Sequence, residues 1–484
     1  MKLIILKIWS NIKASDLGEI LKLSKNYFFG DIAVKVISFL AIPILTRLLS
    51  PADYGIVQVF NSYVGILAIV LPLYTFSAIG RYYYEEKDDF GEFLGCSLIM
   101  TGTIVLFFSI VVMFYRENFQ NLLNLQENLV PLLLWATLID ILTSVYLQIT
   151  VPRKKSVEYS LVNISLAILG VSLSIYLILH MTATRYMGRI YGQLIAGTLI
   201  SIFYIYRISQ LTKFKCYWKH IKYIVSFSIP LMFFPLGNYV LGYVDRIMIN
   251  KIVDSASAGL YSAGYNIALL VVSVSSALLM SFAPYWMKNR NANNFEKNNY
   301  LVKNIFKIVI ASSFALILFS NEIVVVMLPS NYSSAVSVIP VVAIGYVFWA
   351  MFNIYAWHIG YIKKNMYISL AAVLGGILNI IMNLIYIPQY GYIAGAYTTA
   401  VSFFFIFLFT WYAAKYILKQ TVTPLWTIGG SLSLFLVYLG MYWFVLQNLG
   451  INIYAAIAVK SVIFFSFVFL MFYSFIRNYL LFKR

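Results

Sequence analysis

The sequence contains few of the residues from which soluble enzymes build catalytic and metal-binding sites. Its 484 residues include 2 cysteines, 3 histidines and 17 acidic residues. Cys96 falls in an apolar run and Cys216 in a basic loop, so we expect neither a disulfide nor a metal site. Neither a phosphate-binding glycine motif nor a nucleophile motif is present. These absences argue against an enzyme, and we expect no cofactor.

Long polar stretches are also missing. The longest outer loop that we predict, residues 116–128, is too short to be the catalytic loop of a membrane glycan polymerase or ligase. Apolar residues, by contrast, make up 62% of the chain, and charged residues only 11%. This composition lies far outside the range of soluble globular domains. The chain is therefore expected to reside in a membrane.

Apolar runs long enough to cross a bilayer follow one another from residue 26 to residue 476. A spanning helix needs roughly 20 predominantly apolar residues. The runs predict an all-α integral membrane protein with about fourteen transmembrane helices. The predicted spans are 26–48, 55–80, 93–115, 129–151, 159–180, 186–206, 223–250, 258–287, 304–328, 334–360, 366–388, 392–414, 424–447 and 452–476.

The basic residues are concentrated on one side of this alternating topology. Of the 35 lysines and arginines, those predicted on the opposite side are Arg47, Arg116, Arg185 and Lys251. By the positive-inside rule, both termini are then cytoplasmic. The net charge of +18 therefore indicates topology, and we expect no nucleic-acid partner.

A spaced motif recurs along the chain. Arg47 lies eight residues before Gly55, and Lys251 lies eight residues before Gly259, an offset of 259 − 55 = 204 residues. This offset equals six predicted spans, which favours two pseudo-symmetric six-helix lobes around a central cavity. The predicted parts are a cytoplasmic amphipathic segment (1–25), an N-lobe (26–210), a linker (211–222), a C-lobe (223–416), two further helices (424–476) and a cytoplasmic tail (477–484).

The same segments carry a family resemblance. Residues 45–55 and 245–265, the Ser228-Ile-Pro-Leu231 sequence and the Tyr390-Gly391 turn resemble segments of bacterial Wzx-type polysaccharide flippases. These transporters belong to a superfamily with the lipid II flippases and the multidrug and toxin extruders. The resemblance covers the chain from about Lys25 to Ile476, and its motifs are mostly structural.

The resemblance implies a function in surface polysaccharide synthesis, such as that of O-antigen. An undecaprenyl-pyrophosphate-linked oligosaccharide would be moved from the cytoplasmic to the periplasmic leaflet of the bacterial inner membrane. Alternating access, driven by a proton or sodium gradient, is implied in the same way. Membrane lipids would surround the protein, and a polysaccharide polymerase and a chain-length regulator are possible partners.

Polar residues inside the predicted spans are the candidates for contacts with such a substrate. Asp31 and Lys35 are one helical turn apart, which predicts an ion pair, while Asp245 and Arg246 are neighbours in a span that contains Pro230 and Pro235. The substrate-binding candidates are Lys35, Arg246, Arg189, Lys460, Gln58, Asn61, Asn238, Asn266, Asn353, Asn379 and Asn383. Interhelical hydrogen bonding is the alternative explanation for the amides.

Ion coupling needs a group that can gain and lose a charge within the membrane. The candidates are Asp31, Asp140, Asp245 and His358. Asp245 is the first choice, because it lies on the polar face of the span that Pro230 and Pro235 are expected to kink. Asp31, by contrast, is expected to pair with Lys35.

The sequence is also compatible with other functions. A cation-coupled multidrug exporter of the same superfamily would normally have twelve spans and more carboxylates than cations in its cavity, unlike this chain. A lipid II-type flippase, a channel and a scaffold are further alternatives.

Overall fold

The computed structural model describes residues 16–86, 88–124, 129–181, 183–447 and 453–482, with side chains described for 26–442 within these ranges and for 456–473. Helices make up nearly all of this part of the chain, and it contains no strand. The all-α prediction is therefore confirmed. Residues 1–15, most of the predicted amphipathic segment, and residues 483–484 of the predicted tail lie outside the described residues.

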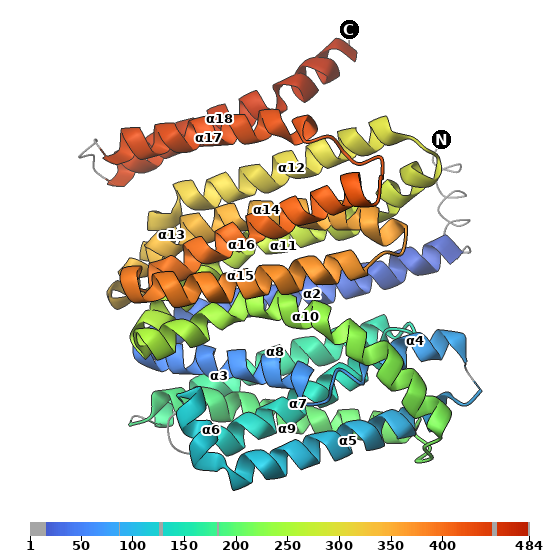
Figure 1. The fold of residues 1–484 in the computed structure, drawn as a ribbon. Helices are drawn as coiled ribbons and strands as arrows, with labels where there is room; N and C mark the ends of the chain where they lie inside the picture. The colour runs from blue at the N-terminus through green and yellow to red at the C-terminus, as the bar shows by residue number, and fades with distance from the viewer. Residues whose placement is uncertain (1–15, 87, 125–128, 182, 448–452, 483–484) are drawn as a thin grey trace, which may run out of the picture. The chain divides into compact units, whose positions relative to one another are not determined.

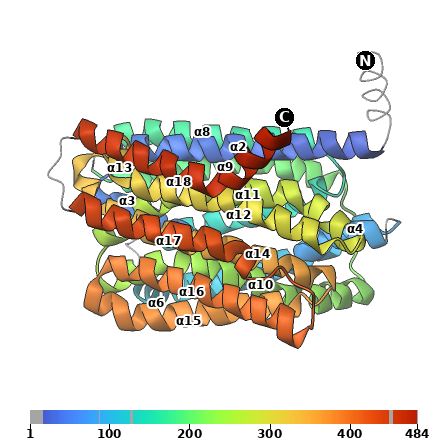
Figure 2. The ribbon, with the colours of Figure 1, turned by 90° about the horizontal axis from the view of Figure 1, so that it is seen from above.

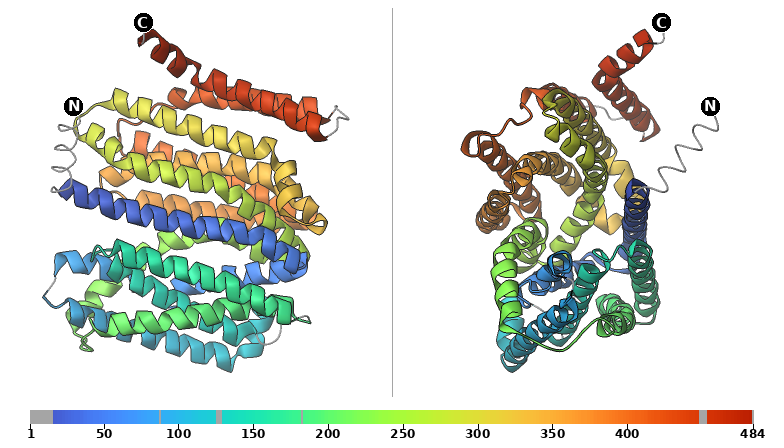
Figure 3. Two further views of the ribbon diagram at one scale, coloured as in Figure 1. Left: turned by 180° about the vertical axis from the view of Figure 1, so that it is seen from behind. Right: turned by 90° about the vertical axis from the view of Figure 1, so that its right-hand side faces the viewer.

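The chain divides into two compact units, residues 1–239 and 240–484, and each is described here by itself. Unit 1 is a bundle of helices that Figure 3 shows end-on in its right-hand view. Its helices are α2 (Asp16–Leu48), α3 (Pro51–Val70), α4 (Ser77–Glu85), α5 (Phe90–Phe114), α6 (Arg116–Leu123), α7 (Leu129–Thr150), α8 (Ser156–His180), α9 (Arg185–Ser209) and the first part of α10 (Trp218–Ile252).

Unit 2 contains the rest of α10 and the helices that follow it (Figure 1). Helices α17 and α18 pack together and against α12, beside which they lie in Figure 2. The helices after α10 are α11 (Ser255–Asn291), α12 (Phe295–Leu318), α13 (Ser320–Met327), the 3-10 helix η1 (Ser330–Ser337), α14 (Val338–Tyr361), α15 (Met366–Tyr390), α16 (Tyr392–Tyr412), the π-helix η2 (Ala413–Ile417), α17 (Trp426–Gln447) and α18 (Ile453–Phe482).

Within the described residues, 12 helices are long and apolar enough to cross a membrane. Two further predicted spans, 186–206 and 424–447, coincide with helices outside these 12. They are the more polar helix α9 and helix α17, whose apolar stretch, residues 426–442, is shorter. The predicted span 55–80 is too long, because α3 ends at Val70 rather than near residue 80. Pro72 has no N–H to continue the helix, and Leu73 and Tyr74 adopt positive φ angles of 50° and 54°.

The recurring motif marks two equivalent helix starts. Ser50 caps α3, where its hydroxyl accepts a hydrogen bond from the Asp53 N–H and the Asp53 carboxylate bonds back to the Ser50 N–H. Asp254 caps α11 by accepting a hydrogen bond from the Ser257 N–H. The caps are 254 − 50 = 204 residues apart, the offset of the motif. Each satisfies N–H groups that the first helical turn leaves free.

Close packing joins α8 to α9 in unit 1, and α2 packs against α8. A Cβ added at Gly192 of α9 would lie 2.4 Å from the Ser174 backbone nitrogen. Such small residues let neighbouring helices in a membrane approach closely.

The prediction that the two cysteines stay apart is wrong. Cys96 and Cys216 form a disulfide, with their Cα atoms 4.3 Å apart. The loop after α9 packs on the start of α5, where the Lys213 N–H donates to the Gly91 carbonyl at 2.9 Å. A Cβ at Gly95 would lie 2.1 Å from the Lys213 carbonyl oxygen. The two cysteines are 120 positions apart in the sequence, so local sequence does not indicate this contact.

Candidate functional site

A buried carboxylate lies at the centre of a polar network in unit 2. The side chain of Asp245 on α10 is fully buried. It accepts hydrogen bonds from the Tyr261 hydroxyl at 2.6 Å, the Asn383 amide at 2.6 Å and the Thr399 hydroxyl at 2.5 Å. These donors come from α11, α15 and α16. Four helices therefore converge on one acidic side chain.

The network extends beyond the carboxylate. The Asn383 amide also donates to the Asn379 side-chain oxygen at 3.2 Å, and the Asn379 amide donates to the Thr399 hydroxyl at 3.4 Å. The Thr398 hydroxyl donates to the Asn383 side-chain oxygen. Asn379, Asn383, Thr398 and Thr399 are all buried. Oxygen atoms of a carboxylate, amides and hydroxyls are thus concentrated in a small volume.

Local sequence features assemble this cluster. Asn379 and Asn383 are one turn apart on α15, so they share a helix face. The turn at Gly391, whose φ is +69°, leads directly into α16, which packs against α15. Gly395 lets α16 approach α10 and α11 closely, because a Cβ there would lie 3.2 Å from Ile249 of α10 and 3.3 Å from Tyr261 of α11.

Arg246 belongs to a second network next to the first. Its side chain is 1% exposed, and its guanidinium lies 4.8 Å and 4.7 Å from the ring centres of Tyr243 and Tyr265. It donates hydrogen bonds to the Gly242 carbonyl at 2.9 Å and to the Asn266 side-chain oxygen at 3.3 Å. The aromatic faces and these oxygens are neutral partners that favour a cation.

The two opposite charges are adjacent in sequence but have separate partners. Neighbouring side chains point about 100° apart around a helix, so Asp245 and Arg246 do not face each other. Among the described residues, neither of them forms an ion pair. An oxygen-rich site around a carboxylate suits a proton or a hard cation. A guanidinium suits phosphate or carboxylate.

The remaining candidates in unit 2 make three different kinds of contact: an ion pair, an aromatic contact and a hydrogen bond within one helix. The Lys460 ammonium donates hydrogen bonds to both carboxylate oxygens of Glu322, at 2.7 Å and 2.9 Å. Glu322 is not among the residues that the sequence analysis selected. His358 is buried and packs edge-on against Trp286, with ring centres 4.9 Å apart. The Asn353 amide donates within its own helix, to the Trp349 carbonyl at 2.8 Å.

The predicted Asp31–Lys35 ion pair of unit 1 is absent from the part of the chain that the structure describes. The Asp31 carboxylate instead accepts a hydrogen bond from the Tyr159 hydroxyl of α8 at 3.2 Å. Lys35 on α2 is exposed, and so is Asp140 on α7. Both charged side chains therefore lie on the surface of unit 1, within helices of membrane-spanning length.

The hydrogen bonds of the other unit 1 candidates are separate from one another within the described residues. The Arg189 guanidinium donates to the Ser174 hydroxyl at 2.8 Å and joins α9 to α8. The Asn238 amide donates to the Phe234 carbonyl at 3.1 Å, within α10. The Asn61 backbone carbonyl accepts a hydrogen bond from the Tyr239 hydroxyl at 3.3 Å. Gln58 of α3 is half-buried.

Unit 1 also contains an acidic network that the sequence did not suggest. Asp89, between α4 and α5, accepts hydrogen bonds from Tyr82 at 2.9 Å, Lys219 at 2.5 Å and His220 at 3.1 Å. Burial opposes ionisation, but these hydrogen bonds outweigh it and lower the pKa of Asp89 to about 2. Nothing in the local sequence indicates that residues 219 and 220 return to this loop.

The helices and their buried polar clusters define a class of protein: a polytopic α-helical membrane protein with the fold of lipid flippases and multidrug transporters. The structure of the lipid II flippase MurJ in an inward closed conformation is similar, with a TM-score of 0.70 at 18% identity, covering 94% of this chain and 100% of that one. An inward-facing multidrug MATE transporter has a TM-score of 0.62 at 15% identity, covering 80% and 96%. These likenesses concern the fold.

The family is identified from the sequence. The model of the family described as "Polysaccharide biosynthesis protein" matches residues 26–289, and the chain belongs to this family. A protein of the Lsg locus of Haemophilus influenzae is 26% identical over 284 residues, covering 55% of this chain and 66% of that protein. The "Probable low-salt glycan biosynthesis flippase Agl15" of Haloferax volcanii is 20% identical over 390 residues, covering 80% and 81%. The chain thus spans slightly less than two thirds of the first of these relatives.

Proposed function

We propose that this protein flips an undecaprenyl-pyrophosphate-linked oligosaccharide across the bacterial inner membrane by ion-coupled alternating access. Membership of the polysaccharide biosynthesis family and similarity to a relative named as a glycan biosynthesis flippase support the general class. The undecaprenyl-linked oligosaccharide, the coupling ion and the inner membrane go beyond this similarity and are part of the proposal. In this proposal both termini are cytoplasmic, and the lipid-linked sugar enters from that side.

One observation carries the proposal: adjacent residues of α10 place a carboxylate and a guanidinium in separate buried networks. A buried charge is costly unless neighbouring groups stabilise it, and ionisable residues within membrane segments are functional candidates by default. A helix that supported only packing would not need either charge. The two networks match the two ligands of a coupled flippase, a cation and a pyrophosphate.

In the proposed mechanism, the oxygens around Asp245 bind a proton or a sodium ion. Binding neutralises the carboxylate and weakens its hold on Tyr261, Asn383 and Thr399, which belong to three other helices. Ion binding thereby changes the relative stability of two arrangements of these helices. This differential binding is the thermodynamic requirement for coupling an ion gradient to movement.

The pyrophosphate is proposed to bind cations at the membrane-spanning helices. Lys35 is exposed on α2, and a charged group facing hydrocarbon would be costly, so we place it in a water-filled cavity. Arg246 is covered by tyrosines in this conformation and meets the pyrophosphate in another state of the transport cycle. Amides and aromatic faces supply neutral contacts for the sugars.

Translocation by purified protein in liposomes tests the function. Wild-type protein should move a pyrophosphate-linked oligosaccharide from one leaflet to the other, measured as the fraction that becomes accessible to a membrane-impermeant glycosidase. Arg246→Ala and Lys35→Ala should each reduce this rate about tenfold, and Arg246→Lys and Lys35→Arg should retain more activity because they keep the charge. Lys222→Ala, which removes an exposed cation from α10, is the control.

Two results would contradict the proposal. Normal translocation by the Lys35→Ala/Arg246→Ala double variant would remove both residues from the substrate site. Gradient-driven export of a cationic dye, without oligosaccharide translocation, would favour the multidrug exporter.

A further inference from the structure

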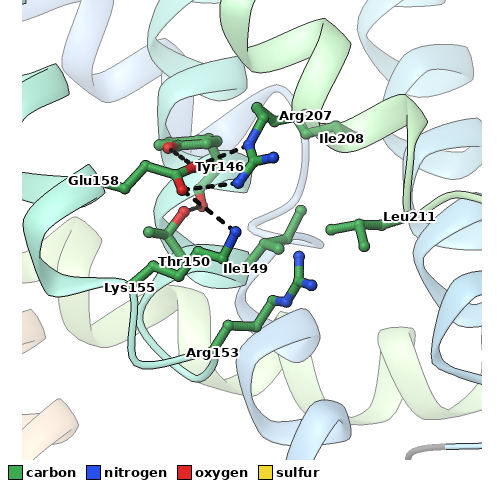
Figure 4. Close-up of a pocket in the computed structure, with 9 residues that line it drawn as sticks. All are labelled: Tyr146, Ile149, Thr150, Arg153, Lys155, Glu158, Arg207, Ile208 and Leu211. Carbon is green, nitrogen blue, oxygen red and sulfur yellow. Dashed lines mark hydrogen bonds and ion pairs between the residues drawn. The ribbon is translucent and has the colours of Figure 1, made fainter.

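A small pocket opens where α7, α8 and α9 of unit 1 end or begin (Figure 4). The chain leaves α7 at Thr150, reverses through residues 151–154 and enters α8 at Ser156. Lys154 adopts a φ of 59° in this turn. The pocket is lined by Tyr146, Ile149, Thr150, Arg153, Lys155, Glu158, Arg207, Ile208 and Leu211.

The only acid in this lining is already fully paired. Glu158 accepts hydrogen bonds from the Tyr146 hydroxyl at 2.7 Å and from Arg207 at 3.0 Å and 2.8 Å. The Lys155 ammonium lies 3.3 Å from the same carboxylate. Both carboxylate oxygens are therefore occupied.

Arg153 is the cation in the lining that remains. It forms no hydrogen bond or ion pair with any residue that the structure describes, and Figure 4 shows its guanidinium apart from the bonded Glu158 group. With three cations and one acid, the lining has a charge of 3 − 1 = +2. The Arg153 guanidinium has free N–H groups, and the rest of the lining has a net positive charge. Such an arrangement suits a phosphate group, which can accept two parallel hydrogen bonds.

The position of the pocket indicates where the phosphate comes from. Helices α7 and α8 are of membrane-spanning length and apolarity, so we expect their adjoining ends to lie at the level of the lipid headgroups. Large apolar side chains are exposed within two turns of the pocket, including Val157 and Leu161 on α8 and Ile202 on α9. An acyl chain can lie against these side chains while its headgroup reaches Arg153.

We propose that this pocket binds the phosphate of an anionic phospholipid headgroup. Arg153 forms the direct contact, and Lys155 and Arg207 supply the surrounding positive potential while they hold Glu158. On the predicted cytoplasmic side, basic residues near the surface attract anionic lipids. A bound lipid links the α7–α8 turn to the end of α9.

Native mass spectrometry of the full-length, delipidated protein tests this site. Dioleoylphosphatidylglycerol and dioleoylglycerol, which has the same chains without phosphate, are titrated separately, and inorganic phosphate is added as a competitor. Wild-type protein should retain the phosphatidylglycerol preferentially. Arg153→Ala should reduce the bound fraction about tenfold, as expected for loss of a charge-assisted hydrogen bond, and Arg153→Lys should have an intermediate effect. The matched control is again Lys222→Ala.

The assignment would be overturned by equal retention of the two lipids by wild-type protein, by unchanged retention by Arg153→Ala, or by an equal loss in Lys222→Ala. Displacement of the lipid by low millimolar inorganic phosphate would assign the pocket to a soluble anion instead. Because the assay measures no transport, its result is independent of the proposed function.

Discussion

Asp89 in unit 1 and Asp245 in unit 2 each accept three side-chain hydrogen bonds, one of them from a tyrosine. Their other donors differ. Asp89 is bound by the ammonium of Lys219, and its side chain is 19% exposed. Asp245 is fully buried and is bound by a threonine hydroxyl and an asparagine amide.

The different donors around the two carboxylates suit them to different roles. The charge of Asp89 is balanced by a lysine, which suits a contact that ties the α4–α5 loop to the start of α10. Within the described residues, only neutral dipoles surround the Asp245 carboxylate, and in the proposed mechanism an added cation neutralises it. An unbalanced buried charge can respond to an ion gradient, whereas a balanced surface pair resists change.

The largest expected effect comes from removing each charge in turn. Asp245→Asn should lower gradient-driven translocation at least about tenfold while leaving binding of the lipid-linked substrate less affected, because the neutral amide cannot bind the coupling ion. Asp89→Asn should keep its response to the gradient. The measurement is translocation in proteoliposomes with imposed proton or sodium gradients, beside equilibrium substrate binding. Equal losses of binding and transport in Asp245→Asn would make Asp245 a substrate contact or a structural residue.

Removing the tyrosine hydroxyl from each network gives a smaller, matched effect. Tyr261→Phe removes a donor that stabilises the charged carboxylate, so a coupling proton should bind about fivefold more tightly, equivalent to roughly 1 kcal/mol. Half-maximal transport should shift to a lower ion concentration. Tyr82→Phe should leave this concentration unchanged. A shift in Tyr82→Phe, or none in Tyr261→Phe, would break the distinction between the two acids.

The smallest effect concerns stability. The pKa of Asp89 falls from its ordinary value of 3.8 to about 2 on folding, so its stabilising contribution is complete above about pH 4 and is lost as the pH falls through about 2. After allowance for solvent screening, this contribution is about 1–2 kcal/mol. Asp89→Asn should therefore lower the Tm in detergent by a few degrees at pH 7, with the difference shrinking toward pH 2.

The neighbouring Asp88→Asn is the control for this measurement, because Asp88 is exposed. A Tm difference for Asp89→Asn that persists unchanged at pH 2 would show that the carboxylate charge is not its source.

Much of the candidate site could be selected from sequence, but its grouping could not. The rarity of polar residues within apolar runs identified Asp245, Arg246, Asn379 and Asn383. Tyr261 and Thr399 were missed, because tyrosine and threonine are unremarkable in membrane helices and 154 residues separate Asp245 from Thr399. Asn379 and Asn383 are predicted substrate contacts, with interhelical hydrogen bonding as the alternative, and the structure places both in the Asp245 network.

Properties that depend on neighbouring residues could be predicted from the amino-acid sequence. Apolar length set the spans, Ser50 and Asp254 set equivalent helix starts, and Pro72 ended a helix earlier than apolarity suggested. Tertiary structure alone decided the partners: Tyr159 rather than Lys35 for Asp31, Glu322 for Lys460, and Cys216 for Cys96. The physical reason is that each of these contacts joins segments more than 100 residues apart, so it depends on which helix faces pack together rather than on local sequence.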